Sequence, residues 1–446
     1  MKHSKTSFLA IVIMVMFISV WNLSCKKEDN IKDDASRTHT KKYKADVANE
    51  WFSLLASNSR IARIPPAPSI RIFAYSSIAL YESVVPGMPS YQSIYKHFTG
   101  NTINVEKKDY YWPAVANAAI ARISQKIIRN YYANPNLTAF QQLETSFNTT
   151  FQNEVGADQL QLSIDFGKFV ADQIYNWSTT DGTLKPDGTL AACPPHVPSG
   201  IPGTWVPTPT AFAAAAGACQ GNLRTFIPNI VNTTLPPPPL PYSTDPSSNF
   251  YMMANEVYQT SLNLSAEDIR LVQSWRDFTP NFNNPSHVLK LASQIVTKEN
   301  TNLEDAAVLY AKLNISISDA IASMFKAKFQ YVQVRPITYI RNVMGYAEWN
   351  TVTPTPQHPA YVSGTSATTA GVTILEKFYG NNYAVVDSTQ QAWIGSWIYP
   401  SLDEFSKNAA RSKILSGHNY RPAIDAAIVQ GRMIGDMVSL LPFKKP

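Results

Sequence analysis

The chain has 446 residues, of which 45% are hydrophobic and 16% charged, a composition typical of a globular protein with a sizeable core. This balance excludes an intrinsically disordered chain, and the length allows one large domain or two to three smaller ones. The net charge is only +6 and no long basic stripe is present, which argues against nucleic-acid binding.

The first 24 residues have the pattern of a signal peptide. Two lysines form a basic start, and the apolar run from Phe8 to Val20 is short for a membrane-spanning helix. Cys25 follows a small residue, as at the processing site of bacterial lipoproteins, although Asn22 and Leu23 fit that site imperfectly. We expect a lipid anchor at Cys25; an uncleaved anchor or an unlipidated signal is the alternative.

Residues 25–45 are dense in charge of both signs, which predicts a solvated tether between the anchor and the folded part. The tether resembles those of exported lipoproteins of Bacteroidetes. The chain is therefore expected at the outer membrane, facing the periplasm or the cell surface, and held to the membrane through the lipid anchor only.

From residue 46 to the end, apolar residues recur at three- and four-residue spacing, which predicts helices. The predicted helical stretches are 45–62, 69–85, 110–132, 138–155, 159–178, 250–263, 265–278, 285–298, 302–333 and 423–440. No convincing alternating strand pattern occurs. The sequence thus predicts one all-α domain over residues 46–446.

Residues from about 180 to 246 interrupt this helical pattern with many prolines and glycines, and they predict a long irregular segment. Cys193 and Cys219 lie in it. In an oxidising compartment they are expected to form a disulfide, with two buried thiols as the alternative. The run of prolines between Leu235 and Tyr242 is typical of a rigid surface loop, or else of a polyproline ligand.

The last third of the chain carries the residues suited to chemistry. They form three stretches: Lys328 and Arg335; Ser363, Gly364 and Thr365; and Lys413 with His418. Arginine offers a planar fork of donors, lysine a point charge, and a glycine before a helix lets backbone N–H groups approach an anion. Together they could hold a tetrahedral oxyanion. The alternative is that the cations are solvated helix residues and the glycines are packing positions.

The order of these stretches resembles the vanadium-dependent haloperoxidases and the related type 2 phosphatidic-acid phosphatases. The likeness lies in three motifs that follow one another in this order. The first is a lysine, six residues and Arg-Pro; the second is His-Pro-x-Tyr-x-Ser-Gly. The third is Ser, a basic residue and Ile, followed by Tyr-Arg and Asp. The likeness extends to residues 59–84, 202–226 and 316–341, and so covers most of the chain after the signal. It implies an all-α, haloperoxidase-like multi-helix bundle with the Pro-rich irregular segment inserted.

The resemblance implies that Lys328 and Arg335 bind an oxyanion together with Ser363 and Gly364. In the family, a histidine that acts as acid or base follows this glycine. Thr365 stands there in this chain. A threonine hydroxyl does not exchange protons near neutral pH as an imidazole does.

The third stretch departs further from the family's pattern. Lys413 stands at the family's arginine and Asn419 at the histidine that bonds to vanadate or attacks phosphate. Ala423 stands at the aspartate that orients this histidine. His418 lies one residue before the aligned position, and on a regular helix one residue turns a side chain by about 100°.

We therefore expect a catalytically degenerate member that keeps a cationic pocket for a small oxyanion or another anionic ligand. Vanadate or phosphate are the groups that the resemblance suggests, and we predict no metal-ion site and no nucleic-acid partner. The alternative is an active phosphatase or vanadium-dependent haloperoxidase that uses His418. The sequence does not predict the oligomeric state.

Overall fold

The computed structural model describes residues 39–61, 66–132, 135–276 and 283–446. The predicted signal peptide, the lipidation residue Cys25 and most of the tether lie outside the described residues. Over the described ranges, no helix has both the length and the hydropathy needed to span a membrane.

Most of the described part is helical, as the spacing of apolar residues predicts. In chain order its helices are η1 (Thr40–Lys42), α2 (Asp46–Ile61), α3 (Pro66–Val84), η2 (Val85–Gly87), α4 (Tyr95–Thr99), α5 (Trp112–Tyr131), α6 (Thr138–Val155), α7 (Ala157–Ser178), η3 (Gln220–Asn222), α8 (Ile230–Thr233), α9 (Asn249–Leu262), α10 (Ala266–Ser274), α11 (Asn284–Lys298), α12 (Leu303–Tyr331), α13 (Pro336–Asn342), α14 (Thr365–Tyr379), α15 (Gln391–Ile394), α16 (Leu402–Leu415) and α17 (Arg421–Ser439).

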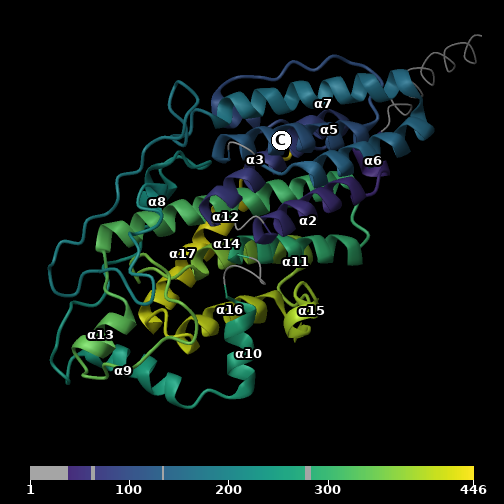
Figure 1. Cartoon of the computed structure of the whole chain (residues 1–446). Helices are drawn as coiled ribbons and strands as arrows, with labels where there is room; N and C mark the ends of the chain where they lie inside the picture. The colour runs from purple at the N-terminus through teal and green to yellow at the C-terminus, as the bar shows by residue number, and fades with distance from the viewer. Residues whose placement is uncertain (1–38, 62–65, 133–134, 277–282) are drawn as a thin grey trace, which may run out of the picture.

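The helices form two bundles that share α12 (Figure 1). In the first bundle α5 packs against α2, α3, α6 and α7. In the second, α14 packs against α11, α12, α16 and α17. Contacts of α12 with α3 and of α11 with α2 join the two bundles into one core. The all-α prediction is confirmed.

α12 is the central helix, and it has 29 residues. Its N-terminus is capped by Asn302, whose side chain accepts a hydrogen bond from the backbone N–H of Asp305. Its apolar residues are buried on most of its faces, which is why this stretch lacks a strong amphipathic pattern. Lys328 lies in its last turn, so α12 carries this cation into the second bundle.

α14 and α17 approach closely because small residues lie between them. A Cβ atom built on Gly431 would lie 2.4 Å from the carbonyl oxygen of Ser366, and one built on Gly435 would lie 2.5 Å from the side chain of Thr373. Only residues without a side chain leave room for this contact. The close approach fixes the start of α14, where the second candidate stretch lies.

One short pair of strands accompanies the helices. Strand β1 (Val385–Asp387) pairs antiparallel with β2 (Trp397–Tyr399), with Val386 opposite Ile398. Each strand has three residues, which is too short to produce a visible alternation in the sequence.

The Pro-rich segment is irregular as predicted, and specific contacts attach it to the helices. Cys193 and Cys219 form a disulfide with a Cα–Cα distance of 5.7 Å. Asp319 of α12 accepts hydrogen bonds from the backbone N–H groups of Phe226 and Ile227, both at 2.9 Å. Burial raises the pKa of the Asp319 carboxyl to about 7.

The proline run is also held against the second bundle. The hydroxyl of Tyr331 donates to the carbonyl of Pro236, and the hydroxyl of Tyr361 donates to that of Pro237, both at 2.7 Å. These contacts favour a rigid surface loop over an accessible polyproline ligand.

Candidate functional site

Lys328 is fully buried at the C-terminal end of α12. Its ammonium group donates to the main-chain carbonyls of Pro359 at 2.8 Å, Ala360 at 3.4 Å and Val362. A lysine has three N–H donors, so these carbonyls match its donor capacity. The charge is thereby solvated by backbone dipoles of the segment 358–362.

Arg335 directly precedes α13, at its N-cap position, and is also buried. Its Nε donates to the carbonyl of His358 and its Nη1 to the carbonyl of His418, both at 2.7 Å. Its Nη2 lies 3.0 Å from Nδ1 of His358. Three of the five N–H donors of this guanidinium are therefore used within the protein.

The segment 358–362 is the common acceptor of both cations. Asn419 adds to the set, because its side-chain amide donates to the carbonyl of Ala360 at 2.7 Å. The segment thus presents its carbonyls inward, toward Lys328, Arg335 and Asn419. Backbone carbonyls here surround the cations that the sequence predicts to surround an oxyanion.

The second candidate stretch begins α14 next to this segment. The hydroxyl groups of Ser363 and Thr365 lie 3.0 Å apart and both residues are buried. The backbone N–H of Ser363 donates to the carbonyl of Ala423 at 2.9 Å, which joins the second stretch to α17. At Gly364 a Cβ atom would meet nothing within 4 Å, so this glycine lines open space.

The third candidate stretch lies at the junction of α16 and α17. Lys413 is buried in the last turn of α16, and its ammonium group donates to the carbonyl of Trp275 at 3.3 Å. The imidazole Nε2 of His418 lies 3.0 Å from the carbonyl oxygen of Thr353 and 3.2 Å from its hydroxyl. The structure thus brings Lys328, Arg335, Ser363 and Asn419 around one segment, and turns the His418 ring toward Thr353.

Burial controls the electrostatics of this region. It lowers the pKa of Lys328 well below its usual value, with a further lowering from Arg335, and it lowers the pKa of Arg335 to about 9. Burial lowers the pKa of His358 strongly and that of His418 to about 3. Both imidazoles are therefore neutral at neutral pH. Among the described residues, neither Lys328 nor Arg335 forms an ion pair with a carboxylate.

Sequence reasoning missed the partners of the cations. The carbonyls of residues 358–362 carry no sequence signal, since every residue has one. His358 does carry one, as an imidazole just before the Ser-Gly pair, but the resemblance assigns it no chemical role. Its ring nitrogen beside Arg335 is visible only once the chain is folded.

The chain is an all-α protein whose fold is similar to that of haloperoxidases of known structure. Residues 308–441, which carry all three stretches, match the family model of the VCPO second helical-bundle domain. The resemblance to the vanadium haloperoxidase superfamily is therefore confirmed for the fold, and over residues 308–441 by a family model. No curated protein matches the sequence.

Solved structures of bacterial enzymes share this fold. A bacterial vanadium-dependent iodoperoxidase is similar with a TM-score of 0.81 and 23% identity, covering 90% of this chain and 96% of that one. A bacterial vanadium-dependent chloroperoxidase is similar in its apo form, with a TM-score of 0.64, 15% identity and coverage of 85% and 94%. Its holo form gives 0.64, 14%, 84% and 92%.

Proposed function

We propose that this chain is a non-catalytic protein with the haloperoxidase fold, in which Lys328 and Arg335 hold the main chain in place of an oxyanion. The observation that carries the proposal is the set of carbonyls around Lys328. The three carbonyls use the donors that would otherwise contact an anion. The pair acts as a clamp that fixes the segment 358–362 against α12 and α13.

The side chains at the reacting positions support the same proposal. Thr365 and Asn419 stand where the resemblance expects imidazoles, and Ala423 has no group that could orient one. Loss of a single member of a cooperating catalytic set already lowers activity by orders of magnitude. The donor set does not fit vanadate, because the Asn419 amide already bonds to Ala360 and no imidazole is aimed at the two cations from the aligned position.

A second candidate is a residual oxyanion site without turnover. The observation that favours it is the burial of two cations without a carboxylate partner among the described residues. A bound anion would compensate this charge. Two of the five N–H donors of Arg335 are not used in its contacts with His358 and His418, so they could donate to such an anion. Such a site would bind phosphate, sulfate or vanadate without converting a substrate.

The role of His418 in an active enzyme stays a prediction. Its imidazole is neutral and faces Thr353, and its position between Lys413 and Arg335 lowers its pKa further. Outer-membrane localisation and lipidation of Cys25 are proposed from the sequence pattern alone. They place the protein outside the cytoplasm, where the Cys193–Cys219 disulfide is stable.

Anion binding separates the two candidates. We would titrate phosphate and vanadate into the purified chain and follow heat and melting temperature, with Arg335→Met as the variant. The clamp predicts no saturable binding to either protein. A saturable stabilisation that Arg335→Met abolishes would replace the clamp by a residual oxyanion site.

A further inference from the structure

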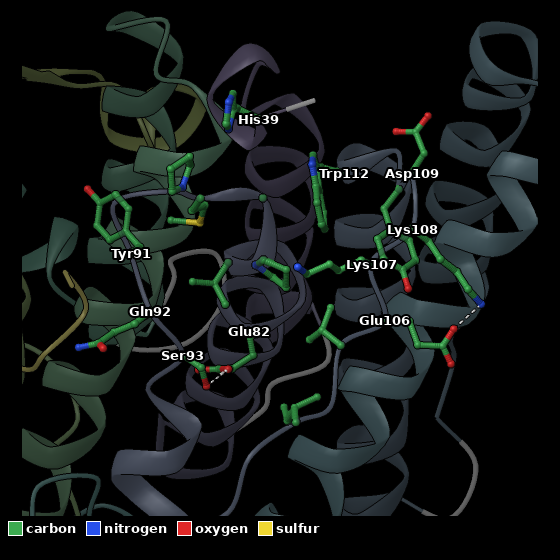
Figure 2. Close-up of a pocket in the computed structure, with 18 of the residues that line it drawn as sticks. His39, Glu82, Tyr91, Gln92, Ser93, Glu106, Lys107, Lys108, Asp109 and Trp112 are labelled. Carbon is green, nitrogen blue, oxygen red and sulfur yellow. Dashed lines mark hydrogen bonds and ion pairs between the residues drawn. The ribbon is translucent and has the colours of Figure 1, made fainter. Parts of the chain in front are cut away.

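A large pocket lies at the other end of α12 from the candidate site. Its volume is about 1080 Å³, and residues of α3, η2, the stretch 88–110 and the C-terminal Lys445 line it (Figure 2). This volume is at the upper end of the range of small-molecule sites. Nothing in the haloperoxidase resemblance assigns a role to it.

The pocket is remote from the candidate site. The backbone N–H of Leu303, the first residue of α12, donates to the carbonyl of Tyr43 at 2.8 Å. The hydroxyl of the nearby Thr40 donates to the carbonyl of Val84, which lies beside the pocket. Lys328 lies 25 residues further along the same helix, which is about 38 Å at the rise of an α-helix. A ligand in this pocket therefore cannot touch the cation clamp.

One wall of the pocket is apolar. Trp112 stands against Gly87 so closely that a Cβ atom on this glycine would lie 2.4 Å from the indole. Met88 and Ile103 also line the pocket, as does Val105, which is 38% exposed. The wall suits a hydrocarbon chain or a ring.

Lys107 and Lys445 line the pocket without a carboxylate partner among the described residues, whereas the acidic groups of the lining have partners within the protein. Glu82 accepts hydrogen bonds from the Ser93 hydroxyl and from the N–H groups of Ile94 and Tyr95, at 2.6, 2.7 and 2.9 Å. Its carboxylate is therefore used within the protein, and burial raises its pKa to about 7.

The remaining acidic groups are also engaged. Glu106 pairs with Lys108 at 2.6 Å, and Asp109 accepts from the side chain of Gln159 at 3.2 Å. Lys107 has no ion pair or hydrogen bond among the described residues, and Figure 2 shows its side chain reaching toward the middle of the pocket. The Lys445 ammonium lies at the same rim and donates to the carbonyl of Pro89 at 2.7 Å.

We propose that this pocket binds an amphipathic organic anion, such as a medium-chain carboxylate. Lys107 pairs with the anionic group, and the wall formed by Trp112, Met88, Ile103 and Val105 covers the hydrocarbon. The cation and the apolar wall lie in one cavity, so the ligand needs both parts. A cation fits the pocket poorly because Lys107, Lys108 and Lys445 all line it.

The test uses the processed chain with Cys25→Ser, so that no detergent competes. Decanoate, decyltrimethylammonium and glutarate are titrated below any critical micelle concentration and binding is followed by calorimetry. We expect saturable binding of decanoate, binding of glutarate at least tenfold weaker, and none of decyltrimethylammonium. Lys107→Met should weaken decanoate binding about tenfold, which corresponds to one lost charge-assisted contact.

Two further variants keep the result interpretable. Lys107→Arg should restore binding because it keeps the charge, and Val105→Asp at the exposed rim should weaken it because the carboxylate repels the ligand. Lys185→Met, an exposed lysine outside the lining, is the matched control and should change nothing. Equal affinity of decanoate for the wild type and for Lys107→Met, equal affinity for glutarate, or no decanoate binding would each overturn the proposal.

Discussion

Lys328 and Arg335 are cations whose burial is compensated by carbonyl dipoles. Each N–H···O=C contact to a charged donor is stronger than a neutral one, but leaving the carbonyl without a donor costs more than the contact gains. This asymmetry makes Lys328 a structural residue if the clamp is right. If Lys328 instead binds an anion, its buried charge lacks its partner while no anion is bound.

Replacing Lys328 by Met distinguishes these two roles. The change keeps the length of the side chain but leaves the carbonyls of Pro359, Ala360 and Val362 without their donor. At about 1 kcal/mol or more for each unsatisfied group, the free energy of unfolding should fall by about 3 kcal/mol in urea denaturation. A fall much smaller than this would contradict the clamp, because the carbonyls would then not depend on the ammonium group.

Lys326→Met is the matched control for this prediction. Lys326 lies two positions earlier on α12 and is partly exposed. Its replacement should leave the free energy of unfolding within about 0.5 kcal/mol.

His418 predicts a pH dependence of stability. Its pKa is about 3 in the folded chain and about 6.5 when exposed. The unfolded state therefore binds a proton between these values that the folded state does not bind, so His418 lowers stability as pH falls from about 6.5 toward 3. The variant His418→Gln lacks this titrating group. Its free energy of unfolding, measured by urea denaturation, should therefore fall less between pH 7 and pH 4.5 than that of the wild type.

The difference between the two proteins isolates His418. Asp319 and Glu82 have raised pKa values near 7, so they lower stability as pH rises from about 4 to 7, and they do so in both proteins. An identical pH dependence in wild type and variant would mean that His418 is solvated and able to titrate.

The surroundings of two glycines at α14 and α17 predict different outcomes when each is replaced by alanine. Alanine is the better helix former, so Gly431→Ala would gain up to about 1 kcal/mol in an exposed helix. Here its Cβ would lie 2.4 Å from the backbone oxygen of Ser366, and overpacking should instead lower the free energy of unfolding by about 1–3 kcal/mol. Gly364→Ala has φ −60° and open space, so it should change stability by less than about 0.5 kcal/mol. Thermal or urea unfolding of the two variants checks the contrast.

Long helices were predictable because their apolar spacing is repeated over several turns. The predicted stretch 302–333 corresponds to α12 (Leu303–Tyr331), and 423–440 to α17 (Arg421–Ser439). The hairpin of β1 and β2 was not predictable, since three residues give no period. Of the predicted site residues, Lys328, Arg335 and Asn419 contact the segment 358–362, whereas Lys413 contacts Trp275 and the His418 ring contacts Thr353. These directions depend on backbone carbonyls that the sequence does not distinguish.

Over its described residues the chain has a haloperoxidase-like fold in two bundles, and the proposal of a non-catalytic protein rests on Thr365, Asn419 and Ala423 at the positions that the resemblance aligns with reacting residues. α12 contacts helices of both bundles, and Lys328 lies in its last turn. The hydrogen bonds of Lys328 and Arg335 join α12 and α13 to the segment that leads into α14.

The most direct test of the clamp measures bromide oxidation and phosphomonoester hydrolysis by the purified chain, with and without vanadate. His418→Ala serves as the paired variant. We predict no vanadate-dependent bromide oxidation and no phosphatase activity above the buffer in either protein. Vanadate-dependent turnover that His418→Ala abolishes would contradict the proposed non-catalytic function and establish His418 as the working histidine.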